Sequence, residues 1–232
     1  MSDERFRPNY TVAVIGCGGI GSWVMHSLIR PLSRFTDAHS ASVEVRMYDS
    51  DLVEDGNLHH QCFRPDDLGK PKVIAVFEEL EALQGSRVRI VPCAWDVRSE
   101  EDILPTDLAL VAVDSPVARK LVTQSEKVSN WAICTCAADS YLFLDESSSE
   151  DSISLVTRSN QEPASCQIPG AIENGNIEAG HLAVAILAQT WILRFLRGLS
   201  GDSGAMIPRT RADSVILGTI GHVGREEGVE NR

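Results

Sequence analysis

The sequence predicts an α/β protein with a doubly wound, mostly parallel sheet and helices on both faces. Strand-like runs of aliphatic residues alternate with helical patterns, which implies right-handed crossover units. A glycine-rich turn joins the first strand to the first helix, and the composition is globular, with 43% hydrophobic and 23% charged residues. We expect residues 1–232 to form a single domain, since this length is ordinary for one α/β unit.

The first strand, turn and helix follow one another at the start of the chain. Residues 11–15 are an uninterrupted apolar run, typical of a strand buried on both faces. Residues 20–30 place apolar side chains at helical spacing, and we expect Pro31 to end this helix. A polar link at 33–40 then leads to a second strand at 43–48.

The later elements are read in the same way. A helix is expected at 72–83, with strands at 87–91 and 108–113. Further strands are expected at 131–136, 141–144 and 153–157, with an exposed acidic loop at 145–151. Proline and glycine at 160–176 predict a crossing loop before a long helix at 177–196, together with one late strand at 214–220.

Charge and cysteine usage narrow the class of protein. Lys and Arg number 21 against 33 Asp and Glu, and the net charge of −12 disfavours nucleic acid and anionic membranes as partners. The apolar stretch at 179–196 contains His181, Gln189 and Arg194, so we expect a buried packing helix rather than a membrane span. Six scattered cysteines without a CxxC motif indicate free thiols in the cytoplasm and no zinc site.

The glycine turn predicts a nucleotide site. Gly16, Gly18 and Gly21 form a GxGxxG motif between a strand and a helix, with Gly19 beside them, as in Rossmann-like dinucleotide folds. The backbone N–H groups at the start of the helix favour phosphate. Asp49, at the end of the second strand, is placed to bind ribose, which leaves a NAD-dependent oxidoreductase open at this point.

The segment that follows the second strand points away from a dehydrogenase. It carries acids, an amide and a lysine in the order Asp49, Asp51, Asn57, His60, Gln61 and Lys72, and Asp114 and Arg119 follow the fourth strand. These motifs resemble, in the same order, those of the ThiF/MoeB/HesA family of adenylyltransferases, bacterial relatives of ubiquitin-activating enzymes. The match extends over residues 12–120, roughly half of the chain.

The resemblance implies an ATP-dependent enzyme that activates a carboxylate as acyl-AMP and releases pyrophosphate. Residues 1–127 would form the ATP-binding half, and residues 128–232 the crossing loop, C-terminal helix and tail. The substrate implied is the C-terminal glycine of a small ubiquitin-like or sulfur-carrier protein, and the enzyme implied is a homodimer.

The resemblance also assigns roles to single residues. The glycine turn and Asn57 would hold the ATP phosphates with Lys72, Asp49 the ribose, and Asp114 a Mg²⁺ ion, and Asp51 and Gln61 would complete the nucleotide site. The chemistry agrees, because attack of a carboxylate on a phosphate joins two anions and needs a metal and a lysine to neutralise them.

One position departs from the family pattern. His60 stands where the family has an arginine that stabilises the triphosphate, and histidine is only partly charged at pH 7. Three cationic sources are open: His60 itself in its charged form, Arg64, or Arg5 and Arg7 delivered from a second subunit. Alternatively the chain is a weak or inactive nucleotide-binding scaffold.

Cys166 is the candidate nucleophile. It lies in the expected crossing loop, where family members that go beyond adenylation carry a cysteine that attacks the acyl-adenylate. A cation or helix N-terminus near such a thiol would lower its pKa. The alternative is a small loop residue without chemistry. Cys134 and Cys136 share one side of an expected strand, which indicates buried thiols rather than a metal pair.

Overall fold

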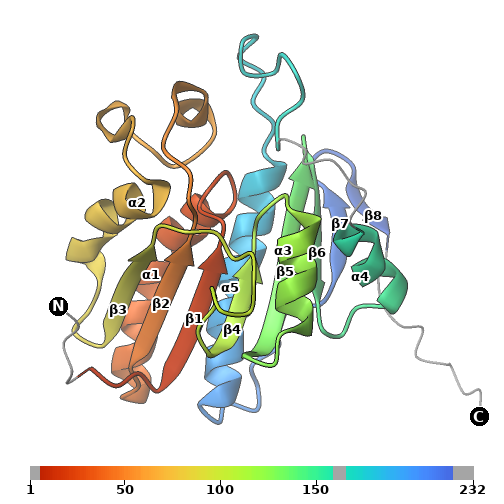
Figure 1. Cartoon of the computed structure of the whole chain (residues 1–232). Coiled ribbons are helices and arrows are strands. Elements are labelled where there is room, and N and C mark those ends of the chain that lie inside the picture. The colour runs from red at the N-terminus through yellow and green to blue at the C-terminus, as the bar shows by residue number, and fades with distance from the viewer. Residues whose placement is uncertain (1–5, 159–165, 222–232) are drawn as a thin grey trace, which may run out of the picture.

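The computed structural model describes residues 6–158 and 166–221, and it contains one eight-stranded sheet (Figure 1). Along the sheet the strands are β3 (Val88–Cys93), β2 (Val43–Tyr48), β1 (Tyr10–Ile15), β4 (Thr106–Val111), β5 (Val128–Ala137), β6 (Ser140–Asp145), β7 (Arg211–Ser214) and β8 (Gly218–Gly221). The first five are parallel, and β6, β7 and β8 are added antiparallel. The predicted doubly wound, mostly parallel sheet is confirmed.

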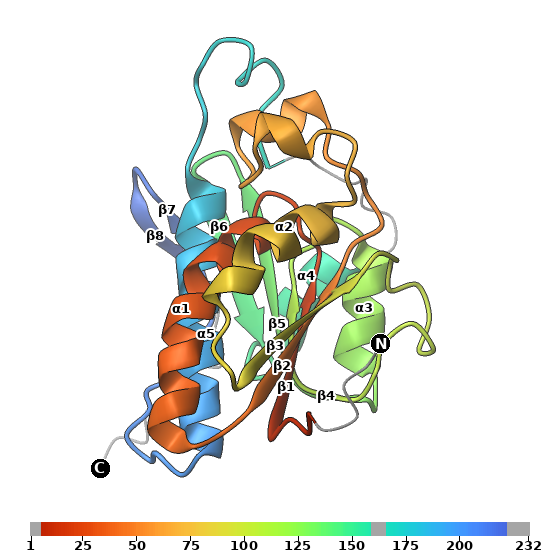
Figure 2. The same ribbon diagram turned by 90° about the vertical axis from the view of Figure 1, so that its left-hand side faces the viewer.

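Helices cover both faces of the sheet (Figure 2). One face carries α1 (Gly21–His39), α2 (Lys72–Leu80) and α5 (Gly180–Leu199), and the other carries α3 (Pro116–Gln124) and α4 (Glu150–Thr157). Each face therefore has its own core. The larger core includes Met25 and Trp191, and the smaller one includes Ile103 and Trp131.

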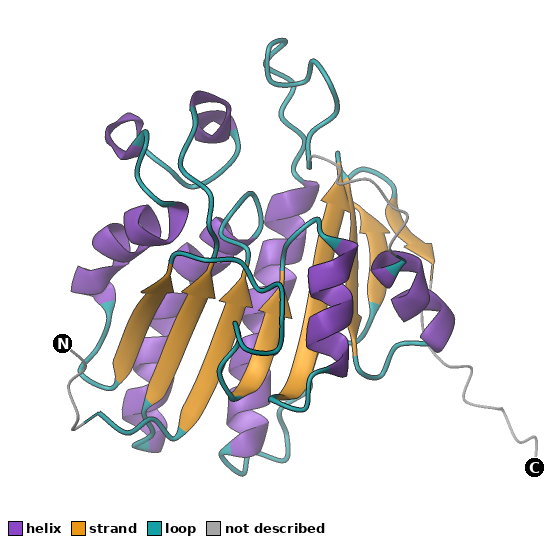
Figure 3. Ribbon diagram, in the orientation of Figure 1, coloured by secondary structure: helices purple, strands orange, loops and turns teal. Residues whose placement is uncertain are grey.

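The strand order reverses between β1 and β4. From β1 the chain moves through α1 to β2 and β3 on one side, whereas β4 and β5 continue on the other. Figure 3 shows long loops above the arrowheads of the parallel strands, including residues 49–71 and 166–179. Ligands of open α/β sheets bind in the crevice at such a reversal, at the carboxyl ends of the strands.

The expectation that Pro31 ends the first helix, with a polar link at 33–40, is wrong. Helix α1 continues through Pro31 to His39 and is closed by Ser40 in the left-handed conformation, at φ 51°. Proline inside a helix costs about 3 kcal/mol. Here Leu32 and Phe35 continue the buried face of α1 beyond the proline, so packing against the core outweighs that cost.

The expected strand at 153–157 is also wrong, because these residues end helix α4. Ser149 caps this helix by accepting a hydrogen bond from the Ser152 amide at 3.3 Å. Glu150 and Asp151 lie in its first turn, where carboxylates complement the helix dipole. The acidic stretch is thus divided between the helix start and Asp145, which is buried at the end of β6.

Other elements differ from their predicted boundaries by smaller amounts. The single late strand at 214–220 is in fact two strands, β7 and β8, joined by a turn at 215–217. Helix α3 was not expected, although Ser115 followed by Pro116 is a typical helix start: the Ser115 hydroxyl accepts from the Ala118 amide at 3.3 Å. The helix predicted at 72–83 is α2 followed by a short 3₁₀ turn at Glu81–Leu83.

Helix α5 confirms the expected long helix and packs beside α1 and strands β5 and β6. By length and composition it is the one helix in the described part of the chain that reaches the threshold for a membrane span, with a mean hydropathy of 1.4. Its buried side chains Trp191, Ile192 and Leu196 belong to the larger core, which agrees with a packing role.

Candidate active site

Two positions of the glycine turn require glycine, because backbone atoms of other residues lie very close to them. Gly16 has φ +96°, and a Cβ atom there would lie 2.7 Å from the carbonyl oxygen of Ala112. A Cβ atom on Gly21 would lie 1.8 Å from the carbonyl oxygen of Gly16. Any side chain at either position would push the turn open, so these two glycines set the packing of α1 against β1 and β4.

Asp49 ties the glycine turn to the end of β2. Its Oδ2 accepts a hydrogen bond from the Cys17 amide at 2.7 Å, and its Oδ1 accepts one from the Asp51 amide at 2.8 Å. Burial raises the pKa of Asp49, while the nearby Lys72 ammonium acts in the opposite direction. The carboxylate therefore fixes two loops at the same edge of the sheet.

Lys72 is buried although it carries a charge, and its Nζ lies 2.8 Å from Oδ2 of Asp51. The backbone explains how residues 21 positions apart meet. Leu52 forms a bridge with Pro71, and the Lys72 amide donates to the carbonyl of Asp51 at 2.9 Å. The end of β2 and the start of α2 are thus held together as a short antiparallel pair.

A cavity of about 220 Å³ opens beside these groups. It is lined by Ile15, Tyr48, Asp49, Asp51, Asp96, Val97, Arg98, Val113, Asp114, Ser115 and Ala118. Sequence reasoning missed Asp96 and Arg98, whose side chains pair at 2.7 Å. Both residues follow the end of β3. Because the carboxyl ends of parallel strands lie at one edge of the sheet, their position after β3 could have predicted them.

Asp114 enters this cavity from the turn between β4 and α3. Buried Arg119 holds the turn, because its Nε donates to the carbonyl of Val113 at 3.0 Å and its Nη1 donates to that of Val156 at 3.3 Å. Arg119 of the sequence motif therefore has a structural role. Its hydrogen bonds fix the backbone of Val113, the residue before Asp114, and link α3 to α4.

His60 and Gln61 lie beside the glycine turn. The His60 ring packs edge-on against the His181 ring, with centroids 6.1 Å apart, and its Nε2 lies 3.3 Å from Nε2 of Gln61. Gln61 Oε1 is buried without a hydrogen-bond partner among the described residues, 3.7 Å from where a Cβ of Gly18 would be. Amide O and N positions are interchangeable; with the amide turned, its NH₂ group donates toward the turn, where phosphate oxygens would accept.

Burial, and then the neighbouring His181, lower the pKa of His60, and burial likewise lowers the pKa of His181. The lowered pKa favours the neutral form of His60 at pH 7. Arg64 is exposed, lies 3.7 Å from a Glu79 carboxylate oxygen, and does not line the cavity. Arg7 is exposed as well, and Arg5 lies outside the described residues.

The histidine pair predicts a pH dependence of stability. Because the folded state lowers both pKa values below the ordinary 6.5, the unfolded chain binds more protons as the solution is acidified. The free energy of unfolding should keep the full contribution of these histidines above about pH 6.5 and should fall as the solution is acidified below that pH. Urea titrations across this range measure it, and a His60→Gln/His181→Asn variant should flatten the slope, whereas the exposed-site control His59→Gln should not.

Asn57 lies one turn before His60 and Gln61, in the 3₁₀ segment Asp55–His59. Its Oδ1 accepts from the Glu54 amide at 3.0 Å, and its carbonyl accepts from the Gln61 amide at 2.9 Å. Asn57 thus organises the backbone that carries His60 and Gln61. It is not among the residues that line the 220 Å³ cavity.

The crossing loop brings Cys166 against the glycine turn. Its Sγ lies 3.6 Å from where a Cβ of Gly19 would be, and its carbonyl accepts from the Ala138 amide at 3.0 Å. A hydrogen bond from the Cys136 thiol lowers the pKa of Cys166, against the effect of burial, which raises it. All six cysteines are free, as expected. Residues 159–165 of the loop lie outside the described residues.

These residues fit a nucleotide with a shared metal. A Cβ atom at Gly18 or Gly19 would meet side chains, not backbone, and the Gln61 Oε1 atom, which has no hydrogen-bond partner among the described residues, lies beside Gly18. Within the described ranges no group of three His, Cys, Asp or Glu side chains is arranged to hold a metal alone. Mg²⁺ needs no such cage, since it binds through one or two carboxylates together with substrate phosphates. Asp114 is one of four carboxylates that line the cavity, with Asp49, Asp51 and Asp96.

A glycine turn at the strand reversal, an acidic pocket and a buried lysine define a nucleotide-binding α/β protein of the Rossmann type. The model of the ThiF family matches residues 7–212, and the chain belongs to this family.

Two curated relatives share short segments with the chain. One is tRNA threonylcarbamoyladenosine dehydratase 2 of Saccharomyces cerevisiae, 39% identical over 66 residues, which is 28% of this chain and 13% of that protein. The other is ubiquitin-like modifier-activating enzyme 5 of Oryza sativa, 32% identical over 80 residues, which is 34% of this chain and 17% of that protein. The chain thus spans less than a fifth of the length of these relatives.

Solved structures agree on the fold over nearly the whole chain. The complex of E. coli MccB with MccA-N7isoASN superposes with a TM-score of 0.62 at 20% identity, over 94% of this chain and 65% of MccB. MccB with ATP gives a TM-score of 0.61 at 20% identity, over the same shares. The PaaA structure gives 0.57 at 16% identity, over 90% of this chain and 62% of PaaA. At these identities the likeness concerns the fold.

Proposed function

We propose that this protein is an ATP- and Mg²⁺-dependent adenylyltransferase that activates a carboxylate as acyl-AMP with release of pyrophosphate. The observation that carries the proposal is the convergence, beside the glycine turn, of the Lys72–Asp51 pair and Asp114 on one pocket. Membership of the ThiF family supports it. This set makes a NAD-dependent oxidoreductase the weaker interpretation.

The residues divide the work by charge. The glycine turn and its N–H groups receive phosphate at the start of α1, and Asp49 and Asp51 border the part of the cavity suited to ribose. Lys72 supplies the fixed positive charge for the transferring phosphate. Asp114 would hold Mg²⁺, which would supply the positive charge needed at the phosphate oxygens. A carboxylate nucleophile is already ionised, so no side chain needs to remove a proton.

The substrate class is part of the proposal: the C-terminal carboxylate of a small ubiquitin-like or sulfur-carrier protein, or of a peptide. It is supported by the name of the rice relative, a ubiquitin-like modifier-activating enzyme, and by MccB, whose structure was solved with MccA. We further propose that the enzyme acts in the cytoplasm as a homodimer, in which Arg5 or Arg7 of a second copy adds a cation to the site.

The test is exchange of labelled pyrophosphate into ATP in the presence of a candidate carrier protein ending in glycine. Exchange that requires both the carrier and Mg²⁺, and that is lost in Lys72→Ala, supports the proposal. If ATP does not bind, or if calorimetry shows NAD binding more tightly than ATP, the adenylation proposal is refuted.

The cation missing at position 60 predicts a gain of function. The lowered pKa favours neutral His60 at pH 7, so His60→Arg adds a permanent charge beside Gly19, whose Cβ position is 3.6 Å from the His60 ring. We expect pyrophosphate exchange to rise by about tenfold, which is roughly 1.4 kcal/mol. His60→Gln is the uncharged control. An unchanged rate in His60→Arg would show that another cation already serves the triphosphate.

Cys166 is proposed to receive the activated acyl group as a thioester. Its thiol borders Gly19 and its pKa is lowered by the Cys136 thiol, so we expect Cys166 to react with iodoacetamide at neutral pH before the other cysteines. Bound ATP should slow this reaction, as peptide mass mapping would measure. Cys136→Ala, which removes the hydrogen-bond donor, should slow the reaction. If Cys166 is labelled equally with and without ATP, its thiol does not lie at the nucleotide site.

A second candidate substrate is a carboxylate on a modified tRNA. The yeast relative is a tRNA threonylcarbamoyladenosine dehydratase, and its matching segment has the higher of the two curated identities, 39%. The net charge of −12 opposes tRNA binding. ATP consumption stimulated by tRNA that carries threonylcarbamoyladenosine, and by no carrier protein, would favour this substrate.

A further inference from the structure

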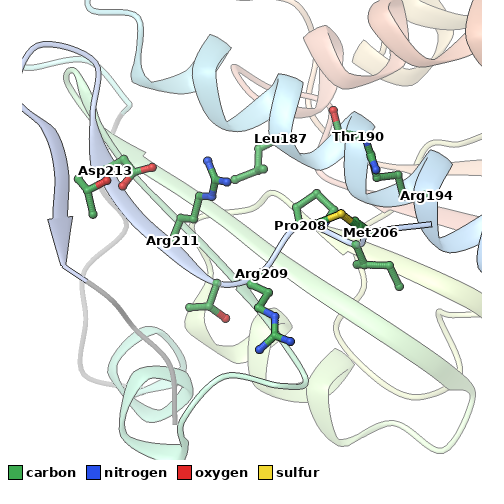
Figure 4. Close-up of a pocket in the computed structure, with 11 residues that line it drawn as sticks. Leu187, Thr190, Arg194, Met206, Pro208, Arg209, Arg211 and Asp213 are labelled. Carbon is green, nitrogen blue, oxygen red and sulfur yellow. The ribbon is translucent and has the colours of Figure 1, made fainter. Parts of the chain in front are cut away.

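A second, larger cavity lies away from the nucleotide site. It has a volume of about 740 Å³ and shares no lining residue with the 220 Å³ cavity. One wall is helix α5, at Leu187, Thr190 and Arg194. The other is formed by residues 206–211, Asp213 and Thr219, which lead into and follow β7 (Figure 4). We call it the α5 groove.

The α5 groove concentrates positive charge on an acidic chain. Arg194, Arg209 and Arg211 line it, whereas the whole protein carries −12. Figure 4 shows Arg211 directed from the strand toward Leu187 of α5, and Arg209 directed to the other side of the same segment. The carboxylate in the groove, Asp213, is buried and accepts a hydrogen bond from the Tyr141 hydroxyl at 3.1 Å.

Arg194, Arg209 and Arg211 lack acidic partners among the described residues, whereas some other arginines of the chain have them. Arg46, Arg98 and Arg197 each pair with a neighbouring carboxylate. Within the described residues, no ion pair or side-chain hydrogen bond involves Arg194, Arg209 or Arg211. Arg194 and Arg211, which line the groove without an ion-pair partner in the described part of the chain, favour an anionic ligand there.

The groove is preformed and partly apolar. Trp191, Ile192 and Leu196 anchor α5 in the core, β7 pairs with β6, and Ser148 and Thr210 hydrogen-bond through their side chains. Met206 is 79% exposed at the rim, next to Ile207. Arginine and methionine are enriched in the parts of a protein surface that bind other proteins.

A neighbouring hollow extends the surface across α5. It has a volume of about 290 Å³ and shares Thr190 and Arg194 with the α5 groove. Arg34 and His39 of α1 line its far side. The basic surface therefore runs from α1 over α5 to β7 and the segment before it.

We propose that the α5 groove is a docking site for a segment of another protein that carries several carboxylates interspersed with apolar side chains. The charge of Arg194 and Arg211 argues for an acidic partner segment, and a second copy of this chain is an alternative outcome of the test. Nucleic acid fits less well, since the rest of the surface is acidic and the rim is apolar.

The test uses a short fluorescein-labelled peptide of alternating glutamate and leucine, with the full-length protein and fluorescence anisotropy as the readout. We expect saturable binding that weakens with added salt and is lost when glutamine replaces glutamate in the peptide. Arg194→Glu/Arg211→Glu should weaken binding by at least about tenfold, whereas Arg194→Lys/Arg211→Lys should retain most of it. Arg87→Glu, an exposed arginine near the opposite edge of the sheet, is the control and should bind as the wild type does.

Three results would overturn the proposal. The first is wild-type binding no tighter than that of the charge-reversed variant, with thermal unfolding confirming that both are folded. The second is a labelled single-stranded RNA of equal charge that binds more tightly than the peptide and competes with it. The third is a dimer in sedimentation that Arg194→Glu/Arg211→Glu dissociates, which would assign the groove to a second copy. Because the groove is separate from the glycine turn, ATP binding by the variants should be unchanged, so these outcomes do not depend on the adenylation proposal.

Discussion

Replacing Asp114 by asparagine should lower pyrophosphate exchange by about 100-fold or more, which is a typical loss when one preorganised electrostatic group is removed from an active site. The side chain lines the acidic cavity, and the turn that carries it is held by buried Arg119 through the carbonyl of Val113. The variant keeps the shape of Asp114 but loses the charge that we propose holds Mg²⁺. The loss should therefore be partly recovered by raising Mg²⁺, which a metal titration of the exchange rate would show.

The matched control is Asp37→Asn. Asp37 is exposed on α1, close to the end of the helix that is remote from the glycine turn, and its substitution should leave exchange unchanged. If Asp114→Asn exchanges at the wild-type rate over the same range of Mg²⁺, Asp114 does not hold the metal, and the catalytic assignment of this cavity fails.

Gly21→Ala should prevent the protein from folding normally. The added methyl group would lie 1.8 Å from the Gly16 carbonyl oxygen, which is backbone and has no side-chain freedom to move aside. Gly16 itself is confined by Ala112, so the clash must separate α1 from the sheet. We expect a destabilisation of about 3 kcal/mol or more, in the upper tail of single substitutions, and loss of ATP binding. Urea denaturation and calorimetric titration measure the two effects.

Two other glycines separate folding from binding. Gly56→Ala meets no atom within 4 Å and should remain stable and bind ATP. Gly19→Ala meets Cys166 Sγ and the His60 ring at ordinary contact distances of 3.6 Å, so it should fold yet weaken ATP binding by filling the space at the turn. A Gly21→Ala protein as stable as Gly56→Ala would contradict the close approach described for the turn.

Local motifs with strong physical requirements were predictable from the sequence. The glycines of the turn, Asp49 at the end of β2 and Asp114 after β4 occupy the sheet edge at which the alternation of strands and helices places them. Lys72 was expected near phosphate from the family resemblance, and the structure brings it to the same acidic cavity through Asp51. These positions follow from one rule, that parallel strands end together.

Elements governed by long-range packing were not predictable. From the sequence, Pro31 is expected to end the helix. In the structure α1 continues past Pro31, because Leu32 and Phe35 extend the buried face of the helix and pack into the core. Residues 153–157 read as a strand by their side chains, but the Ser149 cap starts a helix there. In both cases the local preference amounts to a few kcal/mol at most, and packing or capping reverses it.

The sequence by itself determined the fold class, the glycine turn and the chemistry of the acids and lysine around it, because those features depend on residue type and spacing along the chain. Only the tertiary structure decided that the neutral form of His60 is favoured beside His181, that Arg64 turns away from the cavity, and that Cys166 lies against Gly19. It alone revealed the α5 groove, whose arginines come from α5, from the segment before β7 and from the start of β7. These properties depend on burial and on the distances between segments that are remote in sequence, and the spacing of residues along the chain does not determine either.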